Sequence, residues 1–289
     1  MIKKILLIRS FGNVITRVWK ENRMKDSIAI IGGGVIGASV VKSLLKKGYE
    51  GNITIAEILP EKVKELEQLE VNVTDDNRKA VKEADLVFLC VKPNVVKIVL
   101  EEIHKEVKGK LLLSTAAAVT IGFCKRIAPG ARFVRIMPNL AILVQESFTA
   151  YCCDSNVTME DKEKIKELLG VMGVAMEVTE KHMDAVTAVS GSGPGYISIL
   201  IEAVAYAGLK VGLPRHLALT CAAQAVLGTA KLVLETGQSP AQIRDNVTTP
   251  GGTTIEAIYE IEGSGIRQAL IRAIEAATKK SETIRKQWE

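Results

Sequence analysis

The chain has 289 residues, of which 47% are hydrophobic and 25% charged, with a formal net charge of +5. These values are ordinary for a globular protein of two domains or one large one, and they exclude extended disorder and a small disulfide-stapled fold. The first 25 residues hold seven basic residues and one acidic residue, so the other 264 residues sum to −1. A basic stripe for nucleic acid is therefore not expected.

Residues 1–23 are interpreted as an extension or a mis-set start, because a strand-like pattern begins almost directly after Met24. The apolar run in "MIKKILLIRS" is too short for a secretory signal, although the basic, acid-poor composition also resembles an organelle transit peptide. Nowhere do about 18 uncharged apolar residues follow one another, so no membrane span is expected.

The five cysteines have no C-x-x-C spacing, and the three histidines are scattered along the chain. An odd, unpatterned set of cysteines predicts free thiols and a reducing, cytoplasmic location. The same scatter argues against a metal site. Cys90 is interpreted as core or pocket wall, because nothing nearby in the sequence marks a reactive thiol.

The segment Ser27 to Gly48 predicts a strand, a glycine turn and a helix. Gly32, Gly34 and Gly37 form G-x-G-x-x-G between that strand and that helix, which is the context in which the motif binds a dinucleotide. The first glycine permits the tight turn, the second lets a pyrophosphate approach the backbone, and the third lets helix and strand pack closely. The start of the helix then offers N–H groups and a positive dipole end to the phosphates.

Glu57 ends the second predicted strand, 20 residues after Gly37. A carboxylate there accepts hydrogen bonds from the ribose hydroxyls and repels a 2′-phosphate, which favours NADH over NADPH. The alternatives are a solvated carboxylate at a strand end and a phosphate contact from Lys62 or Lys64.

Further strands are expected in "ADLVFLCVKP", "KLLLSTAA", "RFVRIMPN" and "VAMEV", separated by helical patterns. Strands that alternate with helices predict a parallel sheet with helices on both faces. The fold class is therefore α/β, with a Rossmann-type dinucleotide-binding domain over residues 24–184.

Residues 185–289 show only helix-like segments, rich in alanine and poor in aromatic residues. "RHLALTCAAQAVLGTAKLVLETG" is apolar around most of its circumference, which is typical of a helix buried on all sides. We therefore expect an all-α domain that dimerises by burying these helices against a second subunit. A compact monomeric bundle is the alternative.

The segments "ADLVFLCVKP", "STAAAVTI", "RIMPN", "AVSGSGPGY" and "VTTPGGTT" resemble the pyrroline-5-carboxylate reductase family, in order and spacing, from about Met24 to Arg285. The resemblance implies reduction of the cyclic imine 1-pyrroline-5-carboxylate to L-proline with NADH or NADPH, the last step of proline biosynthesis. It also implies a homodimer, with dimers often assembled into a decamer as a pentamer of dimers.

The chemistry needs a hydride for the imine carbon, a proton at the imine nitrogen and a site for the substrate carboxylate; the cofactor supplies the hydride. The N–H groups of Gly252, Thr253 and Thr254, at the start of a helix, are expected to bind that carboxylate. The resemblance places Thr254 as the catalytic hydroxyl near the nitrogen, either as proton donor or, as we prefer for so weak an acid, as the group that orients a water.

The remaining expected site residues fall into two sets. The substrate set contains Thr249, Gly251, Gly252, Thr253, Ser190 and Gly191. The cofactor set contains Gly32, Gly34, Val35, Ile36, Gly37, Glu57, Asn77, Val91, Lys92, Pro93, Met137, Pro138 and Asn139, and no metal is expected.

Each assignment has a simpler alternative. In the simpler interpretation, Thr254 is an ordinary helix N-cap, Asn77 is the N-cap of a short helix, and Lys92 is a solvated surface lysine. Ser190 would belong to an interdomain hinge with Pro194 in the first turn of the next helix.

The chain also departs from the family pattern. The family commonly has M-P-N-T-P where this chain has Leu140 and Ala141, and serine where it has Thr249. Leu140 and Ala141 motivate the alternative of a related imine or F420-type reductase. A non-catalytic, cofactor-binding paralogue is a third hypothesis.

Overall fold

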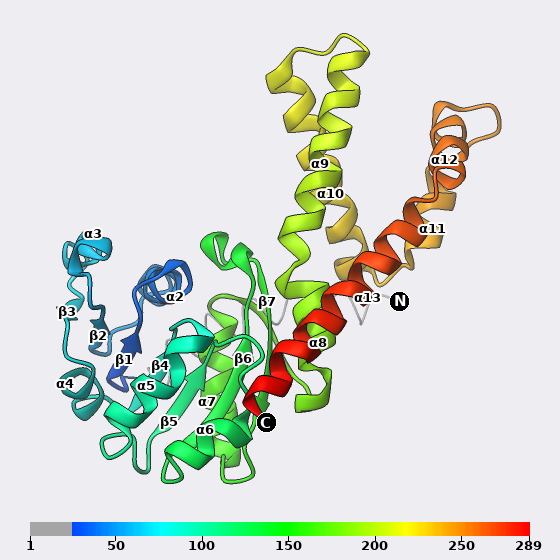
Figure 1. The fold of residues 1–289 in the computed structure, drawn as a ribbon. Coiled ribbons are helices and arrows are strands. Elements are labelled where there is room, and N and C mark those ends of the chain that lie inside the picture. Colours follow the sequence, from blue (N-terminus) through cyan, green and yellow to red (C-terminus); the bar gives the residue numbers. More distant parts are fainter. Residues whose placement is uncertain (1–24) are drawn as a thin grey trace. The chain divides into compact units, whose positions relative to one another are not determined.

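The computed structural model describes residues 25–289 (Figure 1), so the expectations for residues 1–23 lie outside the described residues. The described chain divides into two compact units. One contains residues 25–192 together with residues 275–289, and the other contains residues 193–274. We call them the sheet unit and the helical unit. The domain boundary at residues 184 and 185 stays a prediction.

The sheet unit is built on one eight-stranded sheet in the order β3-β2-β1-β4-β5-β6-β7-β8. Its strands are β1 (Ile28–Ile31), β2 (Ile53–Ala56), β3 (Asn72–Thr74), β4 (Leu86–Leu89), β5 (Leu111–Ser114), β6 (Arg132–Met137), β7 (Ser147–Cys153) and β8 (Gly173–Glu177). Ile28 of β1 pairs with Ile53 of β2 and with Leu86 of β4. Among the described strands the pairing is parallel except between β6 and β7. The Rossmann-type sheet is therefore confirmed, with one antiparallel step that the sequence did not predict.

Helices cover both faces of this sheet, because successive strand residues point to opposite sides. Ile28 and Ile30 pack into one buried cluster and Ala29 and Ile31 into the other. The first cluster takes side chains from α2 (Val35–Lys46), α3 (Lys64–Glu67) and α7 (Met159–Gly170). The second takes them from α4 (Asn77–Lys82), α5 (Pro93–Ile103), α6 (Ile121–Ile127) and α8 (Met183–Val186).

Shorter turns complete the sheet unit. They are 3₁₀-helices η1 (Pro60–Lys62), η2 (Leu140–Val144), η3 (Glu180–His182) and η5 (Lys286–Trp288), and a π-helix η4 (Thr187–Gly191). The π-helix follows α8 directly and leads into α9, so "VSGSGPGY" lies in a continuous helical run. The glycine-rich start of a helix that this segment suggested is therefore a π turn in the structure.

The helical unit contains α9 (Gly193–Lys210), α10 (Arg215–Thr236), α11 (Pro240–Asn246), α12 (Thr253–Gly263) and the first part of α13 (Ile266–Arg285). The backbones of α9 and α10 approach closely, because a Cβ added at Gly208 would lie 2.9 Å from the Cβ of Ala218. The all-helical character of this part is confirmed.

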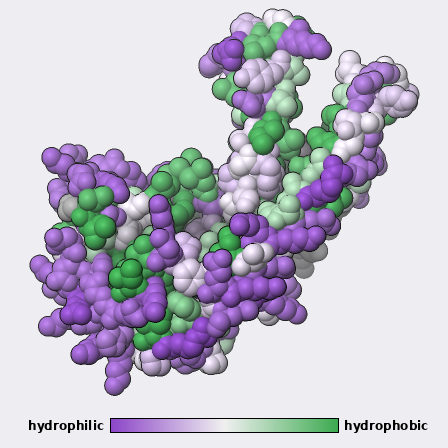
Figure 2. Space-filling model, viewed as in Figure 1, coloured by the Kyte–Doolittle hydropathy of each residue, from purple (hydrophilic) through white to green (hydrophobic). Residues whose placement is uncertain are grey.

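In the single chain, α10 is apolar but largely uncovered. Only Ala218 and Ala222 of its 22 residues are buried. Figure 2 shows apolar surface along α9 and α10. Val204 of α9 is 53% exposed, and Leu234 of α10 is 72% exposed. By length and composition α10 alone among the described helices could cross a membrane, which for one helix is weak evidence.

Candidate active site

The glycine turn has a different packing constraint at each of its three positions. Gly32 has φ +101, and a Cβ on it would lie 2.7 Å from the carbonyl oxygen of Cys90. A Cβ on Gly37 would lie 2.0 Å from the oxygen of Gly32, so this glycine lets α2 pack on the end of β1. Gly34 has nothing within 4 Å of its Cβ position. The middle glycine therefore leaves space for a ligand to approach the backbone at the start of α2.

The N-terminus of α2 has no side-chain cap. Gly34 is its N-cap and makes no capping hydrogen bond, and the first turn contains no acidic residue. The first N–H groups of a helix have no intrahelical partner, and the positive end of the helix dipole lies beside them. Val35 and Ile36 begin this helix, and Val35 is 58% exposed. The turn therefore fits a pyrophosphate group.

Glu57 lies against the glycine turn, directly after β2. Its Oε2 accepts a hydrogen bond from the Gly33 N–H at 2.8 Å, and its Oε1 accepts one from the Leu59 N–H at 3.2 Å. Two backbone donors thus fix the carboxylate beside the turn. A ribose bound next to the pyrophosphate would find an acceptor there.

The other expected cofactor residues follow the same edge of the sheet. Gly32, Glu57 and Val91 come after the carboxyl ends of β1, β2 and β4, which are parallel neighbours. Lys92 is exposed and is the N-cap residue of α5, and Pro93 is its first residue. Ligands bind at this carboxyl edge in sheets of this type.

Cys90, at the same edge, has a raised thiol pKa. Burial raises the pKa of its thiol to about 12. This agrees with its interpretation as a wall residue, because the thiolate is the reactive form.

Asn77 differs from its simpler sequence interpretation. The N-cap of α4 is Asp76, whose Oδ1 accepts from the Lys79 N–H at 2.9 Å. Asn77 is the first residue of the helix, and its Nδ2 donates to Glu102 Oε2 at 2.9 Å. Asn77 therefore links α4 to α5, and the reading as an N-cap is wrong.

Asn139 and Ser190 are brought together, although 51 residues separate them. The Nδ2 of Asn139 donates to the Ser190 carbonyl oxygen at 3.2 Å and to its Oγ at 3.1 Å. The Asn139 N–H donates to Ser147 Oγ at 3.0 Å, and its Oδ1 accepts from the Ala141 N–H at 3.0 Å. All the polar groups of this amide are therefore engaged, and its orientation is well determined.

The chain is tightly packed around this pair. A Cβ on Gly191 would lie 2.7 Å from the Cε of Met137, so a side chain at this position would displace that methionine. Pro138 is buried between Met137 and Asn139. The cofactor residues 137–139 and the substrate residues Ser190 and Gly191, expected from the sequence in separate segments, thus form one cluster in the sheet unit.

In the helical unit, the segment "TTPGGTT" forms a turn that opens α12. Gly251 has φ +67, and Gly252 is the N-cap of α12, without a side-chain capping bond. No threonine caps this helix, so the simpler interpretation of Thr254 as the N-cap is wrong. Helix α12 therefore also begins with an N-terminus that no side chain caps.

One expected donor in this turn is already used. The Gly252 N–H donates to the Thr249 carbonyl oxygen at 3.0 Å, which closes the turn. A Cβ on Gly252 would lie 2.4 Å from Thr249 Oγ1, so that hydroxyl lies directly beside the bare backbone. Of the three N–H groups expected to bind a carboxylate, those of Thr253 and Thr254 remain as donors.

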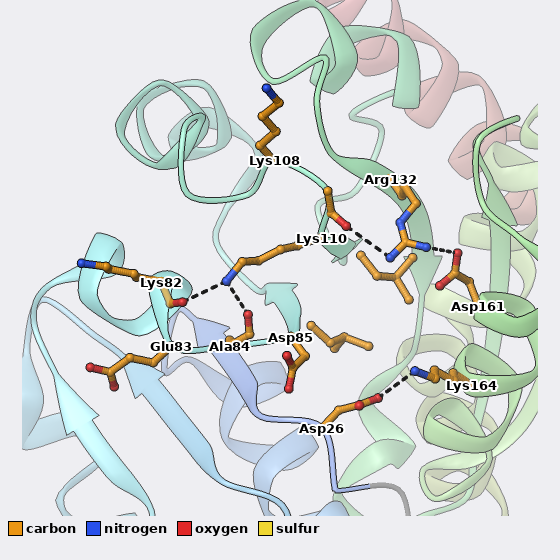
Figure 3. Close-up of a pocket in the computed structure, with 13 residues that line it drawn as sticks. Asp26, Lys82, Glu83, Ala84, Asp85, Lys108, Lys110, Arg132, Asp161 and Lys164 are labelled. Carbon is orange, nitrogen blue, oxygen red and sulfur yellow. Dashed lines mark hydrogen bonds and ion pairs between the residues drawn. The ribbon is translucent and has the colours of Figure 1, made fainter.

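A separate hollow of about 440 Å³ lies at the opposite edge of the sheet, among residues at the amino ends of β1, β4, β5 and β6. Figure 3 shows that charged side chains of both signs line it and that some of them pair with each other or with backbone oxygens. Arg132 pairs with Asp161, Lys164 with Asp26, and Lys110 Nζ donates to the Val81 oxygen at 2.7 Å. These contacts use the charges of those side chains structurally, and the hollow lies at the amino ends of the strands, away from the glycine turn at their carboxyl ends.

Across residues 25–289 there is no group of three or more His, Cys, Asp and Glu side chains that could hold a metal ion. The candidate residues of the two units supply backbone donors, hydroxyls, the Glu57 carboxylate, the Asn77 and Asn139 amides and the Lys92 ammonium group. Such groups orient and bind, and they leave the redox chemistry to a cofactor.

Two protein-family profiles match the chain. "Pyrroline-5-carboxylate reductase dimerisation" matches residues 180–284, and "NADP oxidoreductase coenzyme F420-dependent" matches residues 27–118. The first match covers the uncapped turn before α12, and the second covers the glycine turn and Glu57. The second profile is limited to the nucleotide-binding half, whereas full-length relatives match nearly the whole chain.

Among these relatives, pyrroline-5-carboxylate reductase 2 of Homo sapiens is 37% identical over 260 residues, covering 87% of this chain and 81% of the relative. The pyrroline-5-carboxylate reductase of Methanosarcina acetivorans is 38% identical over 266 residues, covering 90% and 98%. The solved pyrroline-5-carboxylate reductase from Coxiella burnetii has a TM-score of 0.85 at 33% identity and covers 90% of this chain and 99% of its own. The Plasmodium falciparum pyrroline carboxylate reductase, solved with NADP bound, has a TM-score of 0.83 at 28% identity, with coverage of 91% and 99%. Sequence identity over most of both chains, with the same fold in both units, places this chain in the pyrroline-5-carboxylate reductase family.

Proposed function

We propose that the protein reduces 1-pyrroline-5-carboxylate to L-proline, with NADH or NADPH as the hydride source. Family membership supports this activity. The observation that carries it is the uncapped start of α12, where glycine precedes two threonines and no side chain occupies the donors. A protein that only binds a dinucleotide has no need of a second such site for an anion.

The sheet unit fits the cofactor. Gly34 leaves room at the uncapped start of α2 for the pyrophosphate, and Glu57 presents a fixed acceptor for a ribose hydroxyl. Asn139 and Ser190 form an oriented polar pair that we assign to the nicotinamide side. When bound, the reduced nicotinamide supplies the hydride.

For the substrate, we assign the carboxylate to the N–H groups of Thr253 and Thr254, with Gly251 and Gly252 leaving the backbone accessible. The dipole of α12 favours the negative charge. The Thr254 hydroxyl then holds a water or the proton at the imine nitrogen, and protonation makes the carbon a better hydride acceptor. A threonine hydroxyl is a weak acid, so we assign it the relay.

We propose a preference for NADH. The Glu57 carboxylate is held against the glycine turn by two N–H groups, so it cannot easily turn away from a 2′-phosphate. The solved Plasmodium falciparum relative contains NADP, so the preference belongs to this chain's own residue rather than to the family.

We also propose that the working unit is a homodimer formed through the helical unit, with a pentamer of dimers as the larger assembly. The exposed apolar side chains of α9 and α10 support this, since a second copy would remove them from water. The five cysteines of the chain are free thiols, as is usual in proteins of the reducing cytoplasm. We therefore propose a cytoplasmic location.

The proposed function is tested with purified protein, the imine, and NADH or NADPH in separate reactions. We expect the absorbance of the reduced nicotinamide to fall in step with the appearance of proline, measured by mass spectrometry. Cofactor binding without turnover would support the non-catalytic paralogue instead.

Leu140 gives a specific reason to consider a related imine as substrate. It follows Asn139 directly, and its side chain is 51% exposed. An apolar side chain at this position favours a less polar ring than a small polar side chain would. A panel of cyclic imines of different ring size, with and without a carboxylate, distinguishes the two; the highest kcat/KM for the five-membered carboxylate supports the main proposal.

A further inference from the structure

The described chain passes between its two compact units at two places, after Ser192 and after Ile274. The segment before the first crossing contains α8 and the π-helix with Ser190. The segment after the second crossing contains the end of α13 and η5. Within the sheet unit these two segments contact each other through a buried carboxylate on α8.

That carboxylate belongs to Asp184, which is 4% exposed. Its Oδ1 accepts from Ser281 Oγ at 2.7 Å, and its Oδ2 accepts from Arg285 Nε at 2.7 Å. Ser281 is itself buried. Charge-assisted bonds of this length are strong, and removing one partner leaves a buried charge uncompensated. The end of α13 is therefore fixed to α8 (Figure 1).

The residues that follow α13 are held as well, by contacts with α6. The Trp288 ring packs edge-on against Phe123 of α6, with centroids 5.1 Å apart. Thr120 Oγ1 donates to the Trp288 carbonyl oxygen at 3.3 Å, and Arg126 Nη2 donates to the Glu289 carbonyl oxygen at 2.7 Å. Because α6 packs on the sheet, these contacts anchor the end of the chain that follows Arg285. The position of Arg285 is therefore set by α6 as well as by α8.

The position of α8 determines where Ser190 lies. The π-helix begins one residue after α8 ends, and the Thr187 Oγ1 donates back to the Met183 oxygen at 2.7 Å. The Ser192 N–H donates to the Thr187 oxygen at 2.8 Å, which closes the wide turn. π turns are uncommon and are found mostly at functional sites. A shift or rotation of α8 would therefore move Ser190 relative to Asn139.

We infer that Asp184, Ser281 and Arg285 are positioning residues for the reaction, which hold Ser190 against the Asn139 amide through α8 and the π-helix. The inference rests on the proposed function for its kinetic consequence. It gives the C-terminal part of α13 a role in the site although none of its residues belongs to the expected substrate or cofactor sets.

The kinetic test uses Arg285→Lys and Ser281→Ala, each alone and combined with Ser190→Ala. Both single changes are mild, and we expect each to raise KM for the imine about tenfold, since small misplacements of a positioning group cost at least this much. The dissociation constant of NADH, measured by fluorescence, should change much less than KM, because Gly34 and Glu57, which we assign to the pyrophosphate and the ribose, are untouched. In the Ser190→Ala background the same changes should have little further effect, as expected for residues that act through one another.

The matched control is Arg267→Lys. Arg267 lies on the same helix and pairs with Glu262 at the surface, with Nε 2.7 Å from Oε2. This variant should retain the parental KM. Additive effects in the Ser190→Ala background, or an equal effect of Arg267→Lys, would overturn the inference.

A second readout does not depend on turnover. In the free protein, Arg285→Lys should speed hydrogen exchange of the amides at 187–192 and leave those at 32–37 unchanged. Unchanged exchange at 187–192 would overturn the inference even for an active enzyme. Absence of imine reduction by the parent protein would instead refute the proposed function and leave this readout intact.

Discussion

The carboxylate of Glu57 already accepts two backbone hydrogen bonds before any ligand arrives. One comes from Gly33 in the glycine turn and the other from Leu59. A side chain fixed in this way cannot relax when a phosphate approaches, so its charge acts at full strength on the neighbouring ribose position. At the scale of one residue, Glu57 is therefore the strongest candidate for setting cofactor choice.

We predict that Glu57→Ser raises the ratio of kcat/KM for NADPH over NADH about five- to tenfold, the effect of removing one like charge at a few ångströms in a hydrated site. Glu57→Gln is the companion variant, because it removes the charge but keeps one acceptor oxygen, and it should raise the ratio as well. A ratio that stays constant in both variants would show that Glu57 lies away from the ribose.

Buried thiols predict a loss of stability at alkaline pH. Burial raises the pKa of Cys124 and of Cys152 to about 12, from an ordinary value of 9.0. Between these values the unfolded chain binds fewer protons than the folded one, so the free energy of unfolding falls as pH rises.

Urea midpoints measured below and above pH 9 check this prediction. Cys124→Ala should flatten the alkaline decline, whereas Cys221→Ala, at an exposed position, should not. An identical decline in the parent and Cys124→Ala proteins would contradict it.

At the scale of elements, two glycines at the start of α2 have different roles, one in packing and one in binding. We predict that Gly37→Ala lowers stability by about 1–3 kcal/mol, because its Cβ would overlap the Gly32 oxygen and force the backbone to move. Gly34→Ala meets nothing within 4 Å, so it should retain the parental Tm and lose affinity for the dinucleotide. Thermal unfolding and cofactor titration measure the two effects. Equal losses of stability in the two variants would contradict this division of roles.

The start of α12 gives a corresponding prediction for the proposed chemistry. Thr254→Val keeps the shape of the side chain and removes its hydroxyl, so kcat should fall about 100-fold, at the lower end of what positioned proton transfer contributes. Cofactor affinity should not change, and Thr254→Ser should restore most of the rate. A Thr254→Val enzyme with the parental kcat would exclude a role for the hydroxyl.

Much of the sheet unit was predictable because its central strands are short apolar runs followed by glycine, glutamate or proline. The strands that escaped prediction, β3 and β7, lie outside this pattern: β3 has only three residues, and β7 runs antiparallel to β6.

Other features depend on distant partners. In the run Asp75, Asp76 and Asn77, any member could cap the helix, and the Glu102 contact with Asn77 only exists once α5 has packed. The π-helix contains small residues that are equally typical of a loop, so the sequence does not distinguish the two. The Gly252 N–H donates to the Thr249 carbonyl oxygen, and that hydrogen bond depends on a turn geometry that the sequence does not show.

At the scale of the whole molecule, the single chain leaves too much apolar surface in water. Covering one leucine or valine stabilises an assembly by about 1.5–3 kcal/mol, so the exposed side chains of α10 amount to a substantial driving force. The sequence correctly predicted that α10 is apolar around most of its circumference. It does not show which surfaces of two chains pair or how many chains assemble.

We predict that light scattering gives a mass of at least two chains. Leu227→Glu, in the middle of α10, should shift it towards a smaller species. Ile98→Glu is the matched control, because Ile98 is exposed to 65% on α5 of the sheet unit, and it should leave the mass unchanged. A lone parental monomer at all concentrations would contradict the proposed dimer.

The return of residues 275–289 to the sheet unit has a consequence for the order in which the chain folds. Asp184 and Ser281 are 97 residues apart, and Thr120 and Trp288 are 168 apart. Closing loops of that length costs more entropy than forming the βα repeats, and contacts so distant in sequence tend to form late. The sheet can therefore form first, with the surface of α6 that contacts Trp288 still exposed. The sheet unit is complete only when residues 275–289, which follow the helical unit in the chain, have packed onto it.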